Sequence, residues 1–155
     1  GNEFGHPEWI DFPREGNNWS HKHARRIWSL KDNPELRFMA LKDFDQDMIT
    51  LIKRGSVLRY APTQLYVSDS QKVLIFVRGR FIFALNFSPV HSFTDFEFCA
   101  PSGEYRIALN TDAKNYDGFG RIDESVHHFT SRKDGGDKLS LYLPSRSAIV
   151  LEKIR

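Results

Sequence analysis

The stretch from Lys72 to Phe87 reads KVLIFVRGRFIFALNF, two runs of apolar, β-branched and aromatic residues on either side of Arg78-Gly79-Arg80. Both runs are as long as a typical strand, and a short connection that contains glycine is characteristic of a β-hairpin. The sequence therefore predicts two antiparallel strands over residues 72–77 and 81–87.

Further short β-prone segments follow this hairpin at regular spacing. Three of them are residues 93–98, which alternate as F-T-D-F-E-F, residues 105–109 after Ser102-Gly103, and residues 139–143. We expect residues 139–143 to pair with residues 148–152 across Pro144-Ser145. The fold class predicted is mainly β, an antiparallel sandwich over residues 59–155.

The polar, glycine-rich stretch between Asn110 and Asp137 interrupts these strands. We expect a long ordered loop there. Its few large apolar and aromatic residues are its predicted anchors: Tyr116, Phe119, Val126 and Phe129.

Upstream of the hairpin, the periodicity is that of a helix. Asn33 suits the N-cap and Pro34 the first helical position, while Gly55 suits the position after the C-terminus. Apolar residues recur at spacings of three and four, at Leu36, Ala40, Phe44, Met48, Leu51 and Ile52. We predict a helix over residues 34–54, then a linker that contains Pro62, with the domain boundary between residues 58 and 59.

The first thirty residues have neither the period of a strand nor that of a helix before Arg25. They hold all three tryptophans of the chain, Trp9, Trp19 and Trp28. Long segments without regular structure in compact proteins are usually working loops or disordered, and the aromatic content argues against disorder. The stretch is therefore interpreted as a functional loop that is ordered by packing against a scaffold.

Composition excludes several classes of function. The 155 residues carry a formal net charge of +2 with acids and bases interspersed, which provides no field for tracking the phosphates of a nucleic acid. No apolar run is long enough to span a membrane and no basic-then-apolar pattern opens the sequence, so we expect neither a membrane span nor a signal peptide. Cys99 is the single cysteine and cannot form an internal disulfide, so a cytoplasmic location is the simplest expectation.

No metal, cofactor or nucleophile motif is recognisable. His21 and His23 lack a cysteine or an i, i+4 partner, as do the adjacent His127 and His128. Gly135-Gly136 is a turn rather than a phosphate loop, and no Gly-x-Ser-x-Gly elbow occurs. We therefore expect neither a metal nor a cofactor.

Several motifs make the chain similar to a known family. The opening GNEFGHPEW of residues 1–9 closely resembles the glycogen (1,4-α-glucan) branching enzymes of the α-amylase superfamily. The resemblance continues in Asp11-Phe12-Pro13-Arg14, Ala24-Arg25-Arg26, Asn86-Phe87-Ser88-Pro89, Leu109-Asn110-Thr111-Asp112-Ala113, Gly118 with Gly120-Arg121, and Leu143-Pro144-Ser145-Arg146-Ser147-Ala148. It covers essentially the whole chain.

The resemblance implies that residues 1–58 are the last loop and helix of a (β/α)8 barrel and residues 59–155 the C-terminal sandwich. Such enzymes cut an α-1,4 glucan with retention and transfer the piece to a 6-hydroxyl, which requires two carboxyl groups about 5 Å apart. In the family these carboxylates lie on earlier barrel strands, so we expect no catalytic residue in this chain. The resemblance further implies that Asn2, Glu3, His6 and Trp9 line the glucan cleft, with glucan and the preceding barrel as partners.

Two other interpretations stay open at this stage. One is a glucan-binding module, for which Tyr60, Tyr66, Tyr116 or Phe119 must form a flat aromatic strip on one face. The other is a protein-interaction sandwich that self-associates through Phe44, Met48 and Leu51.

Overall fold

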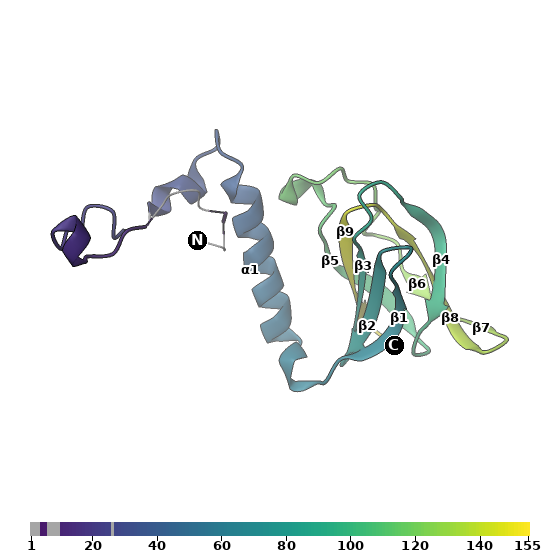
Figure 1. Ribbon diagram of the computed structural model, residues 1–155. Coiled ribbons are helices and arrows are strands. Elements are labelled where there is room, and N and C mark those ends of the chain that lie inside the picture. Colours follow the sequence, from purple (N-terminus) through teal and green to yellow (C-terminus); the bar gives the residue numbers. More distant parts are fainter. Residues whose placement is uncertain (1–3, 6–9, 26) are drawn as a thin grey trace. The chain divides into compact units, whose positions relative to one another are not determined.

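The computed structural model describes residues 4–5, 10–25 and 27–155 (Figure 1). The chain divides into two compact units, residues 1–46 and residues 47–155. The division falls inside a helix, α1, whose residues are Phe38–Arg54. This division separates two compact units of the chain. The predicted boundary at residues 58–59 instead separates a barrel remnant from a sandwich, and it stays a prediction.

In the first unit, the described residues contain little regular structure besides the start of α1. It has two short 3-10 helices, Glu15–Asn17 and Trp28–Asp32. Phe4 is fully buried and contacts the rings of Trp28 and Phe38, with centroid distances of 5.9 Å and 6.0 Å. Phe4 is thus packed within this unit, whereas Trp19 and Trp28 are more than half exposed, and the interpretation of a loop ordered by a separate scaffold stays a prediction.

Helix α1 begins at Phe38, four residues later than predicted. The side chain of Asn33 accepts a hydrogen bond from the backbone N–H of Glu35 (2.9 Å), but the residues that follow form an isolated turn. The C-terminal end is as predicted, since the N–H of Gly55 donates to the carbonyl of Leu51 at 2.9 Å. A β-carbon on Gly55 would lie 2.3 Å from the Phe81 ring, so only glycine fits this close approach.

Residues 63–153 form two antiparallel sheets, as the fold class predicts. The six-stranded sheet has the order β1-β2-β3-β9-β5-β6 and the three-stranded sheet the order β4-β8-β7 (Figure 1). The strands are β1 Thr63–Ser68, β2 Val73–Arg78, β3 Phe81–Asn86, β4 Phe93–Cys99, β5 Glu104–Asn110, β6 His128–Phe129, β7 Ser131–Lys133, β8 Gly136–Leu143 and β9 Ser147–Lys153. The hairpin predicted around Gly79 joins β2 to β3.

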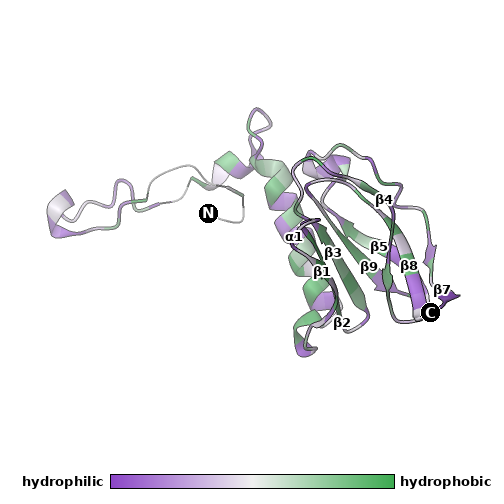
Figure 2. Cartoon of the chain, turned by 45° about the vertical axis from the view of Figure 1, so that its right-hand side comes forward, coloured by the Kyte–Doolittle hydropathy of each residue, from purple (hydrophilic) through white to green (hydrophobic). Residues whose placement is uncertain are grey.

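The sandwich buries apolar side chains on both faces of the larger sheet. Between the sheets, twelve buried residues form one cluster that includes Ile75, Ile82, Leu139 and Leu151. On the outer face, Leu51 of α1 packs in a second cluster with Val57, Phe81 and Val150. Figure 2 shows the hydrophobic colour on the central strands and the hydrophilic colour on β7.

The predicted pairing of residues 139–143 with residues 148–152 is wrong. Strand β8 pairs with β4 and β7, whereas β9 pairs with β3 and β5. The chain crosses from one sheet to the other at residues 144–146, where Pro144 has no N–H to donate and Arg146 has a left-handed φ of 55°. The two strands thus face the same core from opposite sheets, and their local apolar patterns alone do not distinguish this arrangement from a hairpin.

The loop between Asn110 and Asp137 also differs from expectation. Strands β6 and β7 and a 3-10 helix (Lys114–Tyr116) lie within it. Phe119 and Phe129 are not anchors, because their side chains are 74% and 64% exposed. Polar contacts around Asp112 hold this loop, as described below. The linker is predicted over residues 56–65, but strand β1 already begins at Thr63.

Candidate functional site

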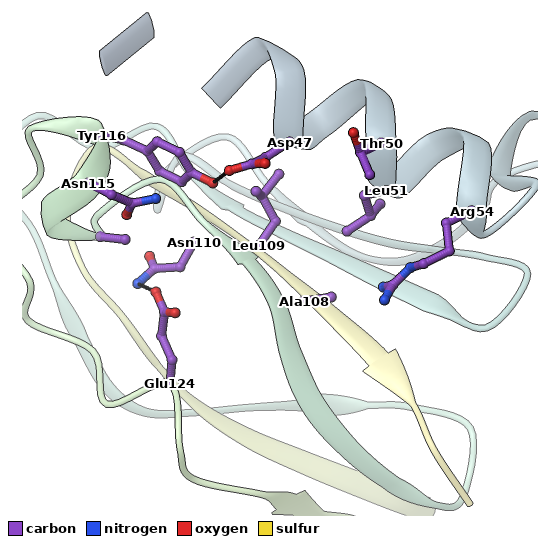
Figure 3. A pocket seen from close by; sticks show the side chains of 11 residues that line it. Asp47, Thr50, Leu51, Arg54, Ala108, Leu109, Asn110, Asn115, Tyr116 and Glu124 are labelled. Atoms are coloured by element: carbon purple, nitrogen blue, oxygen red, sulfur yellow. Dashed lines mark hydrogen bonds between the residues drawn. The ribbon is translucent and has the colours of Figure 1, made fainter. Parts of the chain in front are cut away.

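The residues predicted to line a glucan cleft, Asn2, Glu3, His6 and Trp9, lie outside the described residues. Their role therefore stays a prediction. Within residues 47–155, the structure instead forms a polar pocket of ≈ 240 Å³ between the end of α1 and strand β5 (Figure 3). We call it the α1–β5 pocket.

One face of α1 supplies the first wall of this pocket. Asp47, Thr50, Leu51 and Arg54 follow the i, i+3, i+4, i+7 spacing that places side chains on one side of a helix. The second wall is the end of β5 and the segment that follows it. Its residues are Ala108, Leu109, Asn110, Ala113, Asn115, Tyr116 and Glu124. Figure 3 shows Tyr116 and Asp47 directed toward each other across the pocket.

A phenol–carboxylate contact joins the two walls. The hydroxyl of Tyr116 donates to Oδ2 of Asp47 at 2.5 Å. Burial, with the neighbouring Asp47 carboxylate, raises the pKa of Tyr116 to about 12. The phenol therefore stays protonated at neutral pH and remains a donor to the carboxylate.

Buried Asn110 forms the floor at the end of β5. Its amide donates to Oε1 of Glu124 (3.0 Å), and its carbonyl oxygen accepts from the N–H of Asp112 (2.9 Å). Because both ends of the amide are engaged, its orientation is set by its partners. The carboxylate of Glu124 is thereby held at the rim.

The loop behind the floor is held by Asp112 and Arg121. The Asp112 carboxylate accepts from the backbone N–H of Arg121 (2.7 Å) and from its guanidinium (2.7 Å), which also donates to the carbonyl of Ser145 (3.0 Å). Burial alone would raise the pKa of Asp112, but the hydrogen bonds and charge of Arg121 outweigh it and lower that pKa. A β-carbon on Gly118 would lie 2.3 Å from the backbone of Asp112, so the chain passes very close there.

These groups suit recognition of a small polar molecule. Two carboxylates, two amides, a phenol and a guanidinium offer acceptors and donors that complement hydroxyl groups. Within the described ranges, no three histidine, cysteine or acidic side chains are grouped to hold a metal ion. No described helix is long and apolar enough to cross a membrane.

The aromatic residues considered for a sugar platform lie in different places. Tyr66 packs edge-on against Phe96, with ring centroids 5.2 Å apart, beside the core between the sheets. Tyr60 lies over Gly79 in the β2–β3 turn. Tyr116 and Phe119 instead lie in the segment that follows the C-terminal end of β5. These residues therefore do not form a single strip. Leu51, one of the residues considered for self-association, is buried under the sheet.

A comparison with known protein families shows the family to which the chain belongs. The family described as alpha amylase, C-terminal all-beta domain, matches residues 66–154. This chain belongs to that family.

The curated relatives of this alpha-amylase C-terminal domain are longer proteins. A 1,4-alpha-glucan-branching enzyme of Dictyostelium discoideum is 41% identical over 162 residues, which cover 99% of this chain and 24% of the relative. The chloroplastic/amyloplastic enzyme of that name from Oryza sativa subsp. japonica is 47% identical, over 84% of this chain and 16% of the relative. The chain thus spans about a quarter or less of the length of these relatives.

A solved structure is also similar. It is described as the crystal structure of CldA, the first cyclomaltodextrin glucanotransferase with a three-domain ABC distribution. The similarity covers 93% of this chain and 27% of that one, at 18% sequence identity and a TM-score of 0.49.

Sequence reasoning did not find the α1–β5 pocket of this alpha-amylase C-terminal domain. Asp47 and Arg54 lie on a helix whose sequence pattern indicates only an apolar face, and Glu124 lies in a stretch whose composition predicts only a loop. The usable signal was the Asn110-Thr111-Asp112 run, because short polar side chains directly after a strand often bind nearby backbone groups.

Proposed function

We propose that this chain is the C-terminal portion of a 1,4-α-glucan branching enzyme, which cuts an α-1,4 glucan and transfers the piece to a 6-hydroxyl to form an α-1,6 branch. The observation that carries the proposal is the extent of the similarity. The all-β family match begins at residue 66, yet the Dictyostelium branching enzyme matches 99% of this chain. Residues that precede the all-β domain therefore also resemble branching enzymes.

The role proposed for the chain is support of the catalytic barrel. Retaining cleavage needs a nucleophile and an acid/base carboxyl about 5 Å apart, and we assign these to barrel strands outside this sequence. Within residues 47–155, Leu51 anchors the last turns of α1 to the sheet through Phe81 and Val150. This packing fixes the end of the proposed barrel helix to the outer face of the larger sheet, which suits a supporting domain.

The setting follows from the same proposal. Glucan is the substrate of the whole enzyme, the barrel is the partner of this chain, and the cytoplasm is the proposed location. The lone Cys99 is a free thiol, which fits a reducing compartment.

A chimera tests this proposal. In the Dictyostelium enzyme, the matched C-terminal segment is replaced by this chain, and branching of amylose is followed by iodine staining. We expect the chimera to branch amylose and the chain alone to be inactive. A second chimera carrying Leu51→Asn should lose thermal stability and activity together. A chimera that carries the unmodified chain, folds and yet does not branch amylose contradicts the supporting role.

A second function is favoured by the α1–β5 pocket, namely that the chain itself binds a glucan. Asp47, Asn115 and Glu124 offer acceptors and donors for sugar hydroxyls in a cavity of ≈ 240 Å³. Calorimetric titration with maltoheptaose tests it, with Asp47→Asn as the pocket variant and Asp69→Asn, exposed in the β1–β2 turn, as its matched control. Binding that is weakened by the first change alone supports this function, and the absence of binding refutes it.

A further inference from the structure

Three arginines from separate elements converge on one buried carboxylate at the far end of β9. Glu152 is only 5% exposed and accepts hydrogen bonds from Nη2 of Arg54 (3.2 Å) and Nη2 of Arg106 (2.9 Å), while its Oε1 forms an ion pair with Nη2 of Arg80 at 2.8 Å. Arg54 ends α1, Arg80 lies in the β2–β3 turn, and Arg106 is on β5. We call these four residues the arginine cluster.

The cluster carries more positive charge than Glu152 neutralises. Three guanidinium groups and one carboxylate leave a local charge of +2. Burial opposes ionisation of Glu152, but the hydrogen bond from Arg106 and the charges of Arg54 and Arg80 outweigh it and lower the pKa of this carboxyl. The acid is therefore ionised at neutral pH, and the charge of the cluster is fixed.

The guanidinium groups keep unused donors on their outer side. Each has five N–H donors, of which Glu152 receives one from Arg54 and two from Arg106, while Arg80 is paired with Glu152 by charge. The side chains are 51%, 53% and 49% exposed, so these remaining donors are accessible to solvent.

The positions of the three groups are set before any ligand arrives. Arg106 is held through both Nε and Nη2, and the guanidinium of Arg80 also lies over the ring of Phe81, 5.3 Å from its centroid. Arg54 reaches toward β5 from the last turn of α1 (Figure 3). Groups that are held in place lose little conformational entropy when they bind a ligand.

Fixing the end of α1 to the sheet would require fewer arginines than the cluster contains. One bidentate guanidinium is sufficient to satisfy a carboxylate, and the helix is already held to the sheet through Leu51. Two further arginines place more positive charge beside the first than the carboxylate neutralises. Their exposure and surplus charge instead match an anion in solution.

We propose that the arginine cluster is a binding site for a phosphate monoester dianion or inorganic phosphate. A phosphate monoester carries a charge of about −1.5 to −2 at pH 7 and three acceptor oxygens. This complements a local charge of +2 and three guanidinium groups that approach from different elements. A planar carboxylate presents two oxygens, so it engages the three groups less completely.

The test is a titration of the 155-residue chain with inorganic phosphate, followed by calorimetry and by NMR of the arginine side chains at low ionic strength. We expect one saturable site with a dissociation constant on the order of 1 mM or tighter, and signals that shift for the three arginines together. Acetate at equal ionic strength should bind more weakly. Glucose 6-phosphate, with glucose as its control, distinguishes a phosphorylated sugar from free phosphate as the preferred source of the group.

Matched arginine variants separate a site from general charge. Arg80→Gln and Arg106→Gln should each weaken phosphate binding about fivefold to tenfold. Arg132→Gln removes the same charge from β7, where Arg132 faces only Asp137, and should leave affinity unchanged. Arg80→Lys keeps the charge without the planar fork and should give an intermediate loss.

Protection against unfolding provides a second readout that tolerates an unstable variant. Phosphate should raise the midpoint of thermal unfolding of the unmodified chain and of Arg132→Gln, but less so for Arg80→Gln. An absence of saturable phosphate binding to the unmodified chain overturns the proposal. Equal weakening by all the glutamine variants overturns it as well, because it indicates only long-range attraction.

Discussion

Replacing Glu152 by glutamine should destabilise the sandwich markedly. The substitution keeps the size of the side chain and removes its charge. The amide still has one acceptor oxygen, but its NH2 group then faces guanidinium donors with no acceptor between them. Three arginines are left near one another without the carboxylate that holds them.

The geometry sets the size of the expected effect. Loss of a partner from a fully buried ion pair costs about 3–5 kcal/mol. Here the arginines are about half exposed and water can solvate them, so the loss is closer to that of one or two hydrogen bonds to a charged group, at about 1.5–3 kcal/mol each. We expect the free energy of unfolding to fall by about 2 kcal/mol, which lowers the melting temperature of a chain of this length by about 4–8 °C.

Unfolding in urea at pH 7, monitored by circular dichroism, measures this difference. Glu97→Gln is the matched control, because Glu97 is paired with Lys133 on the surface and should contribute less than about 1 kcal/mol. A change of under about 0.5 kcal/mol for Glu152→Gln refutes the assignment of Glu152 as an organising charge, since ordinary surface substitutions produce effects of that size.

The pH dependence provides an independent check on the same residue. The pKa of Glu152 is below its ordinary value of 4.5 in the folded state. Its stabilising contribution is therefore complete above about pH 4.5 and is lost as the pH falls below that toward the folded pKa. The stability difference between the unmodified chain and Glu152→Gln should narrow over that acidic range.

Three other changes test the fold. Gly118→Ala should cost about 1–3 kcal/mol by overpacking, because the new β-carbon meets the backbone of Asp112 at 2.3 Å, and denaturant unfolding measures this loss. Leu139→Ala, in the centre of the core, should cost about 2–5 kcal/mol in the same assay. Leu58→Ala is its control and should be near neutral, because Leu58 is 68% exposed. Burial and the nearby His127 lower the pKa of His128 from 6.5, so folded stability should fall as the pH drops below 6.5, and His128→Gln should flatten that dependence between pH 7 and 5. An unchanged slope in this variant contradicts the role of His128.

Local patterns were sufficient to predict the elements that bury apolar residues at a regular period. The β2–β3 hairpin and the C-terminal end of α1 are confirmed. Both could be predicted because turn glycines and runs of apolar residues determine structure over a few neighbouring residues. The start of α1 was placed too early, since Asn33 stabilises a local turn about as readily as a helix.

Local patterns predict less well which strands pair with each other. Residues 139–143 alternate as a strand with one buried face, and residues 148–151 are apolar throughout, but neither pattern says which strand is the partner or whether the two lie in the same sheet. The crossing at residues 144–146 depends on distant polar contacts, such as the amide of Asn86 that donates to the carbonyl of Leu143 at 3.1 Å. No short window of sequence contains both of these groups.

The candidate sites depend on the same long-range placement. Asp47 and Tyr116 are 69 positions apart in the chain, and Arg54 and Glu152 are 98 apart. The resemblance to a family predicts a site within the first nine residues, most of which lie outside the described part of the chain. Polar side chains on a helix chosen for its apolar face carried no independent signal.

The position of β9 has a consequence during synthesis on the ribosome. This strand lies between β3 and β5 in the larger sheet, yet every other strand precedes it in the chain. A nascent chain that has not reached residue 147 therefore has two unpaired strand edges at the middle of its sheet, which are prone to aggregate. The sheet therefore closes only after β9 has left the exit tunnel, and products that terminate before residue 147 should be targets for chaperones and proteases.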